Sequence, residues 1–223
     1  SHDEEATLVE HLTELRHRLL ICIIALAPAF AIAYAFHEQL IGRLMDLVPE
    51  GTPIVTLGVT EPFTTSLKVS FYAAIAIVLP ILLWQLWAFL APAVSDETQR
   101  VLGVFVVLAT FLFVTGVLFC YAIVLPKALS FLVDYDSELY TEQIRASYFL
   151  SFVTLTLLAF GIAFEMPIFI LGLVRLGVLT ADRLRKNRRI GYVGMLAFAI
   201  LLPTVDPVSL VLETVPLLVL FEA

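Results

Sequence analysis

Acidic side chains inside apolar stretches are the residues most able to do chemistry in this chain. Glu165 lies within the run 146–174, and Glu213 lies within the shorter run 207–221. A charged carboxylate at the centre of a bilayer costs about 2.5 to 3.5 kcal/mol on insertion scales, so such a residue is by default a functional candidate. A structural role is the alternative for Glu165, because Pro167 frees a backbone carbonyl that a protonated carboxyl could bond. The shortness of its run leaves the depth of Glu213 open.

A second set of charged residues flanks the apolar stretches. Glu14 precedes Arg18 by four residues, and on a helix such an exposed ion pair contributes about 0.2 to 0.5 kcal/mol. Asp96 and Glu97 follow Ser95, which can cap a helix whose N-terminal dipole favours the two acids. Both groups therefore have a structural explanation. For Glu97, a functional role and this dipole role stay equally open.

Signatures of enzymes and of nucleic-acid binding are missing from the sequence. It contains no His-Glu-x-x-His, Gly-x-Ser-x-Gly or Gly-x-x-x-x-Gly-Lys pattern, so we expect no catalysis and no cofactor. The 13 Lys and Arg form no long basic surface interleaved with aromatic residues, which argues against a nucleic-acid partner. Cys22 and Cys120 each lie in an apolar run and are predicted to be small buried hydrophobes, with neither a disulfide nor a bound metal.

The composition indicates that water is not the main solvent of this chain. It is 61% hydrophobic and 15% charged, with a mean hydropathy of +0.99, well outside the range of soluble domains. A helix needs about 20 apolar residues to cross a bilayer core. Four runs meet that length: 19–36, 69–90, 101–126 and 146–174. The prediction is an all-α, polytopic integral membrane protein, with one transmembrane domain over residues 1–223.

Two further membrane helices are predicted to be short. The run 190–202 has 13 residues before Pro203, which corresponds to about 20 Å of helix, and the run 207–221 is similar. We expect both to dip into the membrane, tilt or thin it locally, which brings the count to six. The last run ends without a basic anchor, so we expect the native chain to continue past Ala223.

The distribution of Lys and Arg predicts the orientation. With the N-terminus in the cytoplasm, nine of these residues lie on the cytoplasmic side and four on the other side. Both termini are thus predicted to lie on the cytoplasmic side of the lipid bilayer. On the opposite face, apolar residues at helical spacing from Leu40 to Val48 predict an amphipathic helix on the membrane surface or over the end of the bundle.

Six motifs follow one another along the chain. They are HLTELRHRL at 11–19, EPF at 61–63, WAFLAPA at 87–93, Ser151-Phe152, FGIAFEMP at 160–167 and Asp206. In order and spacing they resemble the TatC family, the signal-peptide receptors of the twin-arginine protein translocase. The resemblance implies a glove-shaped, concave bundle of six helices, the last two short, in the cytoplasmic membrane of a prokaryote.

The resemblance further implies that the chain receives signal peptides with paired arginines, carried by proteins that are exported folded. Guanidinium groups stay charged at physiological pH and offer a planar fork to carboxylates, so such a receptor needs acidic groups at the cytoplasmic interface. The implied signal-peptide site consists of Glu14, Arg16, Phe89, Asp96 and Glu97. The glutamate usual in the loop between the second and third helices falls here on Thr98, so Glu97 or Asp96 would have to replace it.

The resemblance also implies partners. Glu165 matches a polar residue on the concave face, near which single-span helices of TatA and TatB type dock, and Asp206 and Glu213 are further candidates for this contact. The proton-motive force would drive export, and homo-oligomers stay open. The residues alone allow a second interpretation, an ion- or proton-coupled secondary transporter that uses Glu165, Glu213 and Asp206. Against it, we find no internal repeat of the kind many such transporters contain.

Overall fold

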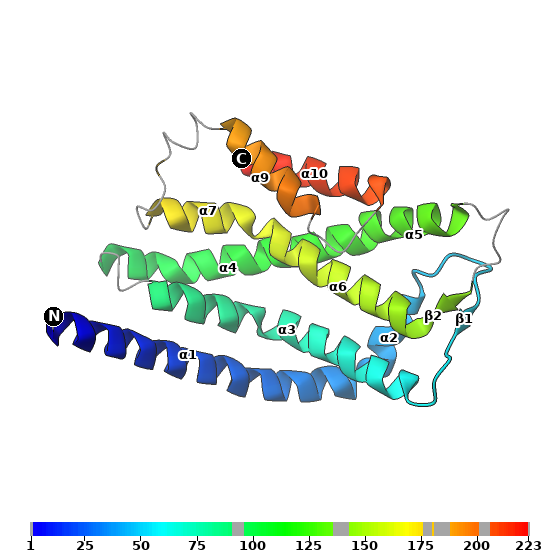
Figure 1. Cartoon of the computed structure of the whole chain (residues 1–223), viewed down its shortest axis with the longest axis horizontal. Helices are drawn as coiled ribbons and strands as arrows, with labels where there is room; N and C mark the ends of the chain where they lie inside the picture. The colour runs from blue at the N-terminus through cyan, green and yellow to red at the C-terminus, as the bar shows by residue number, and fades with distance from the viewer. Residues whose placement is uncertain are drawn as a thin grey trace.

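The computed structural model describes residues 2–90, 96–135, 143–175, 180, 188–200 and 206–222; for 2–10, 90, 96–102, 190, 195 and 198 it describes the backbone alone. Figure 1 shows a bundle of long helices that run alternately in opposite directions. The elements are α1 (His2–Ala35), α2 (His37–Met45), β1 (Ile54–Val55), α3 (Glu61–Leu90), α4 (Asp96–Phe119), the π-helix η2 (Cys120–Val124), α5 (Leu125–Asp134), β2 (Ile144–Arg145), α6 (Ala146–Phe164), α7 (Met166–Arg175), α9 (Arg188–Ile200) and α10 (Pro207–Glu222).

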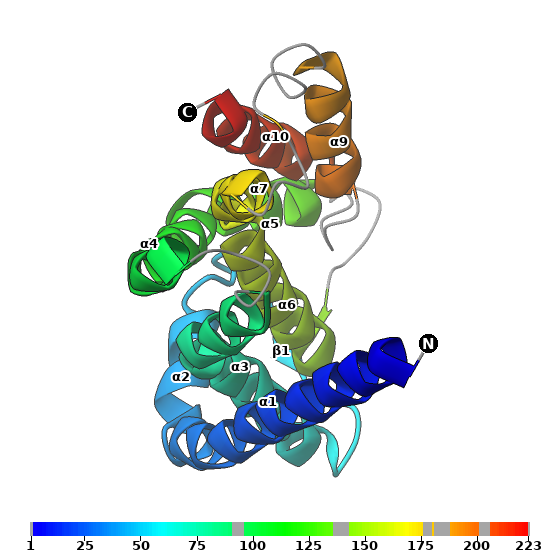
Figure 2. The ribbon, with the colours of Figure 1, turned by 90° about the vertical axis from the view of Figure 1, so that its left-hand side faces the viewer.

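Four helical segments are long and apolar enough to cross a membrane. They are His11–Ala35, Glu61–Phe89, Gly103–Asp134 and Ala146–Arg175. The predicted all-α fold is confirmed, apart from the two-residue strands. α9 and α10, with 13 and 16 residues, are shorter than these spans, and the number of six membrane helices stays a prediction. Figure 2 shows α1 at one edge of the bundle and α9 with α10 at the opposite edge.

The outer surface of the long helices is apolar. Ile24 is 69% exposed, Val107 68% and Phe111 69%. In water such a surface would be strongly unfavourable, whereas the hydrocarbon of a bilayer solvates it as well as a protein core would. The long helices therefore present the surface that a lipid environment requires.

Small residues let the long helices approach one another closely. Ala29 and Ala33 on α1 are buried against Ala74 and Val78 on α3, each pair four residues apart. Between α4 and α6, a Cβ at Gly116 would lie 2.7 Å from the carbonyl oxygen of Phe160. In a membrane, helix association depends on such close packing, because the lipid tails are as apolar as the side chains.

The third long helix continues past the end expected at Pro126. It runs through η2 and α5 to Asp134. Proline has no N–H and its ring clashes with the carbonyl four residues before it, which normally ends or kinks a helix. Here the backbone widens into a π-turn, in which the N–H of Leu125 bonds the carbonyl of Cys120. The wider turn accommodates the proline without ending the helix.

The end of the bundle away from the N-terminus is covered by α2, as predicted from its spacing. Leu44 is buried in the main core, and Leu40, Ile41 and Met45 pack against that core. Near α2, β1 and β2 pair in parallel, with Ile54 opposite Ile144. This end of the bundle is therefore closed by residues 37–55 and the segment leading into α6.

Glu61 joins three segments at this same end. Its Oε1 accepts hydrogen bonds from Arg145 Nε at 3.0 Å and from the Ser147 N–H at 3.2 Å. Its Oε2 accepts from the N–H groups of Leu57 and Gly58 at 2.9 and 3.2 Å. Both oxygens of this buried carboxylate are thus satisfied, which fixes the start of α3 relative to the start of α6.

Candidate functional site

The other end of the bundle brings together most of the residues predicted for the signal-peptide site. The first half of α1, the end of α3 and the start of α4 all lie at this end (Figure 1). Glu14 forms the ion pair with Arg18 that its spacing allowed, with 2.6 Å between Oε1 and Nη2. The Glu14 side chain is 33% exposed and that of Arg18 is 21% exposed. A carboxylate is therefore available to solvent beside the end of α3.

Arg18 also connects α1 to α3. Its Nη1 donates to the side-chain oxygen of Gln85 and its Nη2 to the carbonyl of Ala88, both at 3.1 Å. Its Nε donates to Glu14 at 3.0 Å. The guanidinium thus bonds three different groups, which sets the position of Glu14 relative to α3.

Phe89 lies beside this ion pair and stacks on His11. The two ring centroids are 4.3 Å apart and the rings are inclined by 24°. A hollow of about 160 Å³ lies between α1 and α3 at this point. Its walls are mostly apolar: Leu15, Arg18, Leu19, Cys22, Leu82, Gln85, Leu86 and Phe89. The site therefore combines a carboxylate with an adjacent apolar surface.

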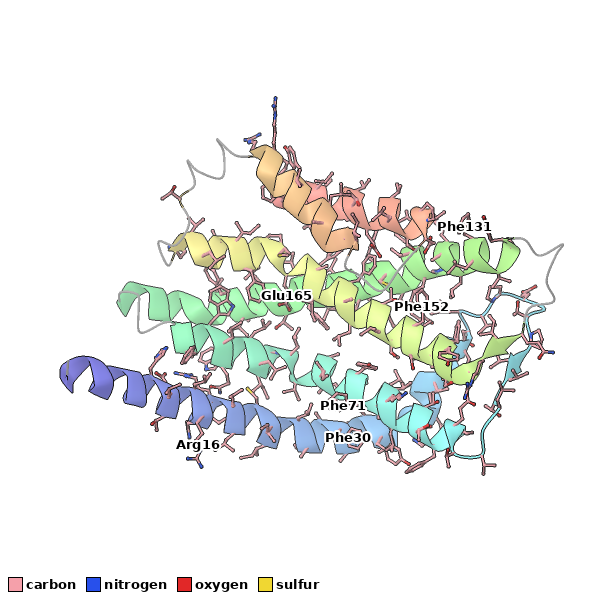
Figure 3. The ribbon with its side chains drawn as sticks, viewed as in Figure 1. Arg16, Phe30, Phe71, Phe131, Phe152 and Glu165 are labelled. Carbon is pink, nitrogen blue, oxygen red and sulfur yellow. The ribbon has the colours of Figure 1, made fainter. Side chains whose placement is uncertain are left out.

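The other predicted residues of the site are placed less directly. Asp96 and Glu97 occupy the first turn of α4, where a negative charge interacts favourably with the helix dipole, and their side chains lie outside the described residues. Ser95, the predicted cap, also lies outside the described residues. Arg16 is exposed and points away from the bundle (Figure 3), so the structure does not bring it to Glu14.

Sequence reasoning missed His11 and Gln85 as members of this site. Gln85 offered a signal, since it is the one amide in the uncharged run 69–90. A primary amide is costly in hydrocarbon unless it is hydrogen-bonded, so its presence indicates a polar partner. His11 offered less, because its contact with Phe89 depends on the packing of α1 on α3.

Glu165 lies at the junction of α6 and α7, midway along the bundle (Figure 3). It is 1% exposed, and its Oε1 has no hydrogen-bond partner among the described residues. Its backbone N–H bonds the carbonyl of Ile162 and its carbonyl accepts from Phe169, so the helical chain turns here without using the carboxyl group. The proposed bond to a carbonyl freed by Pro167 is not observed at Oε1. A buried carboxyl oxygen without a partner is unfavourable and is typical of functional positions.

Asp206 and Glu213 are both buried, Asp206 directly before α10 and Glu213 within it. Asp206 caps this helix: its Oδ1 accepts from the Ser209 N–H at 2.7 Å, and Pro207 stands at the first helical position. Its Oδ2 is buried and has no partner among the described residues. Glu213 is 1% exposed on the same inward face as Ser209 and lies near Cys120 of η2. Asp206 thus has a clear structural role as the N-cap of α10.

Comparison with known proteins decides between the interpretations. A family model described as Sec-independent protein translocase protein (TatC) matches residues 10–216. The chain belongs to the TatC family. TatC of Aquifex aeolicus is 37% identical over 96% of this chain and 91% of its own length. TatC of Escherichia coli is 33% identical over 100% of this chain and 88% of its own length.

A solved structure agrees with this membership. The crystal structure of the twin-arginine translocase receptor TatC in DDM superposes with a TM-score of 0.82 at 34% identity, over 95% of this chain and 96% of that one. The family predicted from the motifs is confirmed. These matches support a transport subunit of a protein translocase, which is not a family of catalytic enzymes. They do not support the ion-coupled transporter.

The cap on α10 predicts how Asp206 responds to substitution. Asp206→Ala should destabilise the folded protein by about 1 kcal/mol, the usual effect of losing a helix N-cap, because the Ser209 N–H loses its acceptor. Asp206→Asn keeps an acceptor but removes the charge, and it should stay close to the wild-type melting temperature. Thermal unfolding of the purified protein in detergent measures both. Equal losses in the two variants would contradict the capping role.

Proposed function

We propose that this chain is the receptor and core subunit of a twin-arginine translocase. It captures the paired-arginine signal peptides of folded proteins at the end of the bundle that holds Glu14. One observation carries the proposal: in a chain of the TatC family, Glu14 lies partly exposed beside the apolar hollow at Phe89. A twin-arginine signal peptide offers guanidinium groups to the carboxylate and apolar residues to the hollow.

Arginine is favoured over lysine for a physical reason. A guanidinium forms two parallel hydrogen bonds with one carboxylate, while an ammonium acts as a point charge. Hydrogen bonds to charged groups contribute about 1.5 to 3 kcal/mol when desolvated and less at a part-exposed position such as Glu14. A second carboxylate is therefore needed to bind two arginines with high affinity. In this proposal, Asp96 and Glu97 at the start of α4 provide the second carboxylate, because Thr98 stands where the family usually has a glutamate. Arg16 borders the site on the outer face of α1.

The membrane arrangement proposed here has six helices in a glove-shaped, concave bundle. α9 packs against α10, and α10 packs against α5, α6 and α7. The shortness of α9 and α10 favours a locally thinned bilayer. The N-terminus faces the cytoplasm of a prokaryotic cell, in keeping with the distribution of Lys and Arg. A bundle of this size has no room for a folded protein, because each helix is about 10 Å wide.

Partners must therefore complete the transport path. Single-span proteins of TatA and TatB type dock near Glu165 in this proposal, with Asp206 and Glu213 on α10 as the neighbouring polar groups. The Oε1 of Glu165 has no hydrogen-bond partner in the part of the chain that the structure describes, which supports the assignment, since a polar group on a partner helix would satisfy it inside the membrane. The energy comes from the proton-motive force.

The proposed receptor site predicts selective peptide binding. The wild-type chain in nanodiscs should bind a twin-arginine peptide at least tenfold more tightly than its Lys-Lys version at low salt. Glu14→Lys should abolish most of that preference because it places a cation where the carboxylate stood, and Glu97→Lys tests the second acid. Glu38→Lys, an exposed acid on α2 at the opposite end, is the matched control. Fluorescence anisotropy measures the affinities, and equal affinity for the two peptides would refute the proposal.

The proposed partner contact predicts a different defect for Glu165. Glu165→Gln should lower the association of TatA- or TatB-type partners and the export of folded protein several-fold, while peptide capture stays near the wild-type level. Thr156→Val is the control, because it removes a different buried polar group, the hydroxyl of Thr156 on α6. Co-purification and an export assay provide the readouts. Loss of folded protein in Glu165→Gln would favour a structural role.

A further inference from the structure

The guanidinium of Arg18 occupies a site that has the chemistry of an arginine receptor. Four of its hydrogen bonds reach three acceptors: the Glu14 carboxylate, the Gln85 side-chain oxygen and the Ala88 carbonyl. A carboxylate with two neutral oxygens around one planar fork is the arrangement that recognises arginine and discriminates against lysine. The chain's own arginine thus sits where a ligand arginine would.

The acceptors on α3 owe their availability to the local sequence. The last four carbonyls of a helix lack partners within it, and Ala88 is among them in α3. Residue 92, which would normally donate to Ala88, is a proline without an N–H. The negative end of the helix dipole adds to the attraction for a cation. The availability of the Ala88 carbonyl at the end of α3 therefore does not depend on Arg18.

We propose that Arg18 is an internal occupant of this site and that an arginine of the signal peptide displaces it. The proposal rests on the receptor function argued above and adds Gln85 and the Ala88 carbonyl to the peptide site. The Arg18 side chain is 21% exposed, so its guanidinium can move into solvent while the aliphatic stem remains on α1. Exchange of one guanidinium for another keeps every acceptor paired, and it makes binding selective for ligands that can replace the whole set of bonds.

Removing the internal occupant should therefore tighten peptide binding. Arg18→Met keeps the length of the side chain and lacks donors, and it should lower the Kd for a twin-arginine peptide about two- to five-fold, the factor that corresponds to a part-exposed ion pair. Arg43→Gln removes a cation at the other end of the bundle and controls for net charge. A purely structural Arg18 predicts the opposite sign, because Glu14 would lose its position. Unchanged or weaker binding overturns the proposal.

Two further measurements keep the test decisive. Gln85→Leu should weaken peptide binding more in the Arg18→Met background than in the wild type. In the wild type, Arg18 and the arginine of the peptide both lose the same acceptor, so the two losses largely cancel. Equal effects in both backgrounds overturn the proposal. If Arg18→Met does not fold, Arg18→Lys replaces it. The three N–H groups of an ammonium cannot make the four bonds of the planar guanidinium fork, so this variant should also give tighter binding. A wild type that discriminates Arg-Arg from Lys-Lys, combined with no gain in these variants, refutes the displacement and leaves the receptor function intact.

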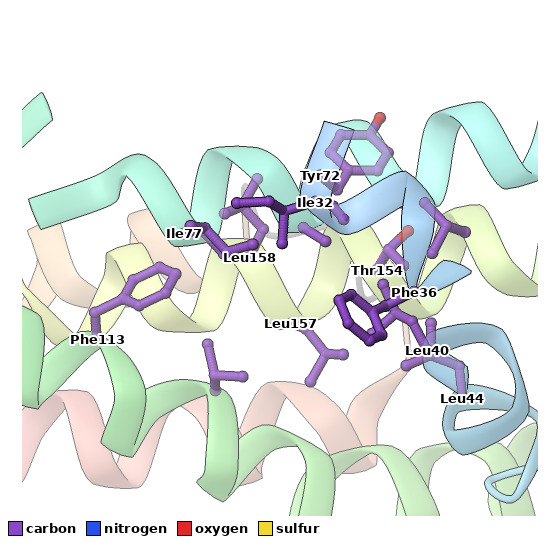
Figure 4. Close-up of a pocket in the computed structure, with 15 residues that line it drawn as sticks. Ile32, Phe36, Leu40, Leu44, Tyr72, Ile77, Phe113, Thr154, Leu157 and Leu158 are labelled. Carbon is purple, nitrogen blue, oxygen red and sulfur yellow. The ribbon is translucent and has the colours of Figure 1, made fainter. Parts of the chain in front are cut away.

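A separate feature lies toward the opposite end of the bundle. A hollow of about 380 Å³ opens between α1, α2, α3, α4 and α6 (Figure 4). It is lined by Ile32, Ala33, Phe36, Leu40, Leu44, Val69, Tyr72, Ala73, Ala76, Ile77, Phe113, Val117, Thr154, Leu157 and Leu158. Tyr72 and Thr154 are the only hydroxyls in this wall, and that of Thr154 already donates to the Leu150 carbonyl at 2.6 Å.

The surroundings of this hollow decide what can fill it. Its rim carries exposed apolar side chains on the lipid-facing surface, with Ile32 at 54%, Phe36 at 60% and Ile77 at 52%. Water is unstable in a space without polar partners, and engineered apolar cavities of about 150 Å³ stay dry and bind small hydrocarbons. A helix, about 10 to 12 Å across, is too wide to enter. We infer that this groove holds an acyl chain of a membrane phospholipid.

Photolabelling tests the lipid site. A phospholipid with a diazirine on one acyl chain, incorporated in nanodiscs, should label residues 69–77 and 154–158 several-fold more than the exposed face of α1. Ala76→Phe fills the groove and should reduce that labelling several-fold, whereas Ala27→Phe, on an exposed face of α1, should not. Ala73→Leu is the milder variant if Ala76→Phe does not fold. Labelling no stronger than on α1 would mean a groove that stays empty or holds protein, and overturns the inference.

Discussion

The structure depends on one constraint: inside hydrocarbon, every polar group must find its partner within the protein. The long helices satisfy their own backbones, which leaves the side chains and the helix ends to be paired. Glu61 is fully bonded where α3 begins, and Asp206 caps α10. Arg18 serves the end of α3, where a proline has removed the normal donor. Charged residues thus gather at the helix ends, where the chain's backbone most needs them.

Exceptions to this constraint are informative for the same reason. Glu165, in the middle of the bundle, has a carboxyl oxygen with no hydrogen-bond partner among the described residues. The Oδ2 of Asp206 is likewise buried without a hydrogen bond among the described residues, and a buried carboxyl oxygen in this situation is unfavourable. In the proposed function, a polar group on a partner helix would satisfy the oxygen of Glu165. The proposed docking of single-span proteins and the physical chemistry of the site therefore point to the same residue.

The two ends of the bundle differ in how they treat an arginine. Arg145 is bound to a buried carboxylate that also receives three backbone N–H groups, so that pair is part of a rigid junction. Arg18 shares a partly exposed carboxylate with two neutral oxygens beside a hollow. Four backbone and side-chain donors on one carboxylate fix a structure. Three acceptors on one partly exposed guanidinium would allow the exchange proposed above.

Much of this molecule was determined by the sequence alone. The length of the apolar runs set the four long spans, because bilayer thickness and helix rise leave few alternatives. Motif order identified the family, and helical spacing predicted α2. The pair Glu14 and Arg18 also followed from spacing, since residues four apart meet on any helix. Local periodicity and solvent therefore fixed the elements and the contacts within them.

Only the tertiary structure decided which elements meet. The convergence of Gln85 and the Ala88 carbonyl on Arg18 depends on how α1 packs against α3, across 67 and 70 residues of chain. The pairing of Glu61 with Arg145 depends on a contact across 84 residues. The continuation of the helix past Pro126 was also visible only in the structure, where a π-turn at Cys120–Val124 carries the chain into α5. Such contacts arise from the shapes of two surfaces together, and neither surface can be read from its own stretch of sequence.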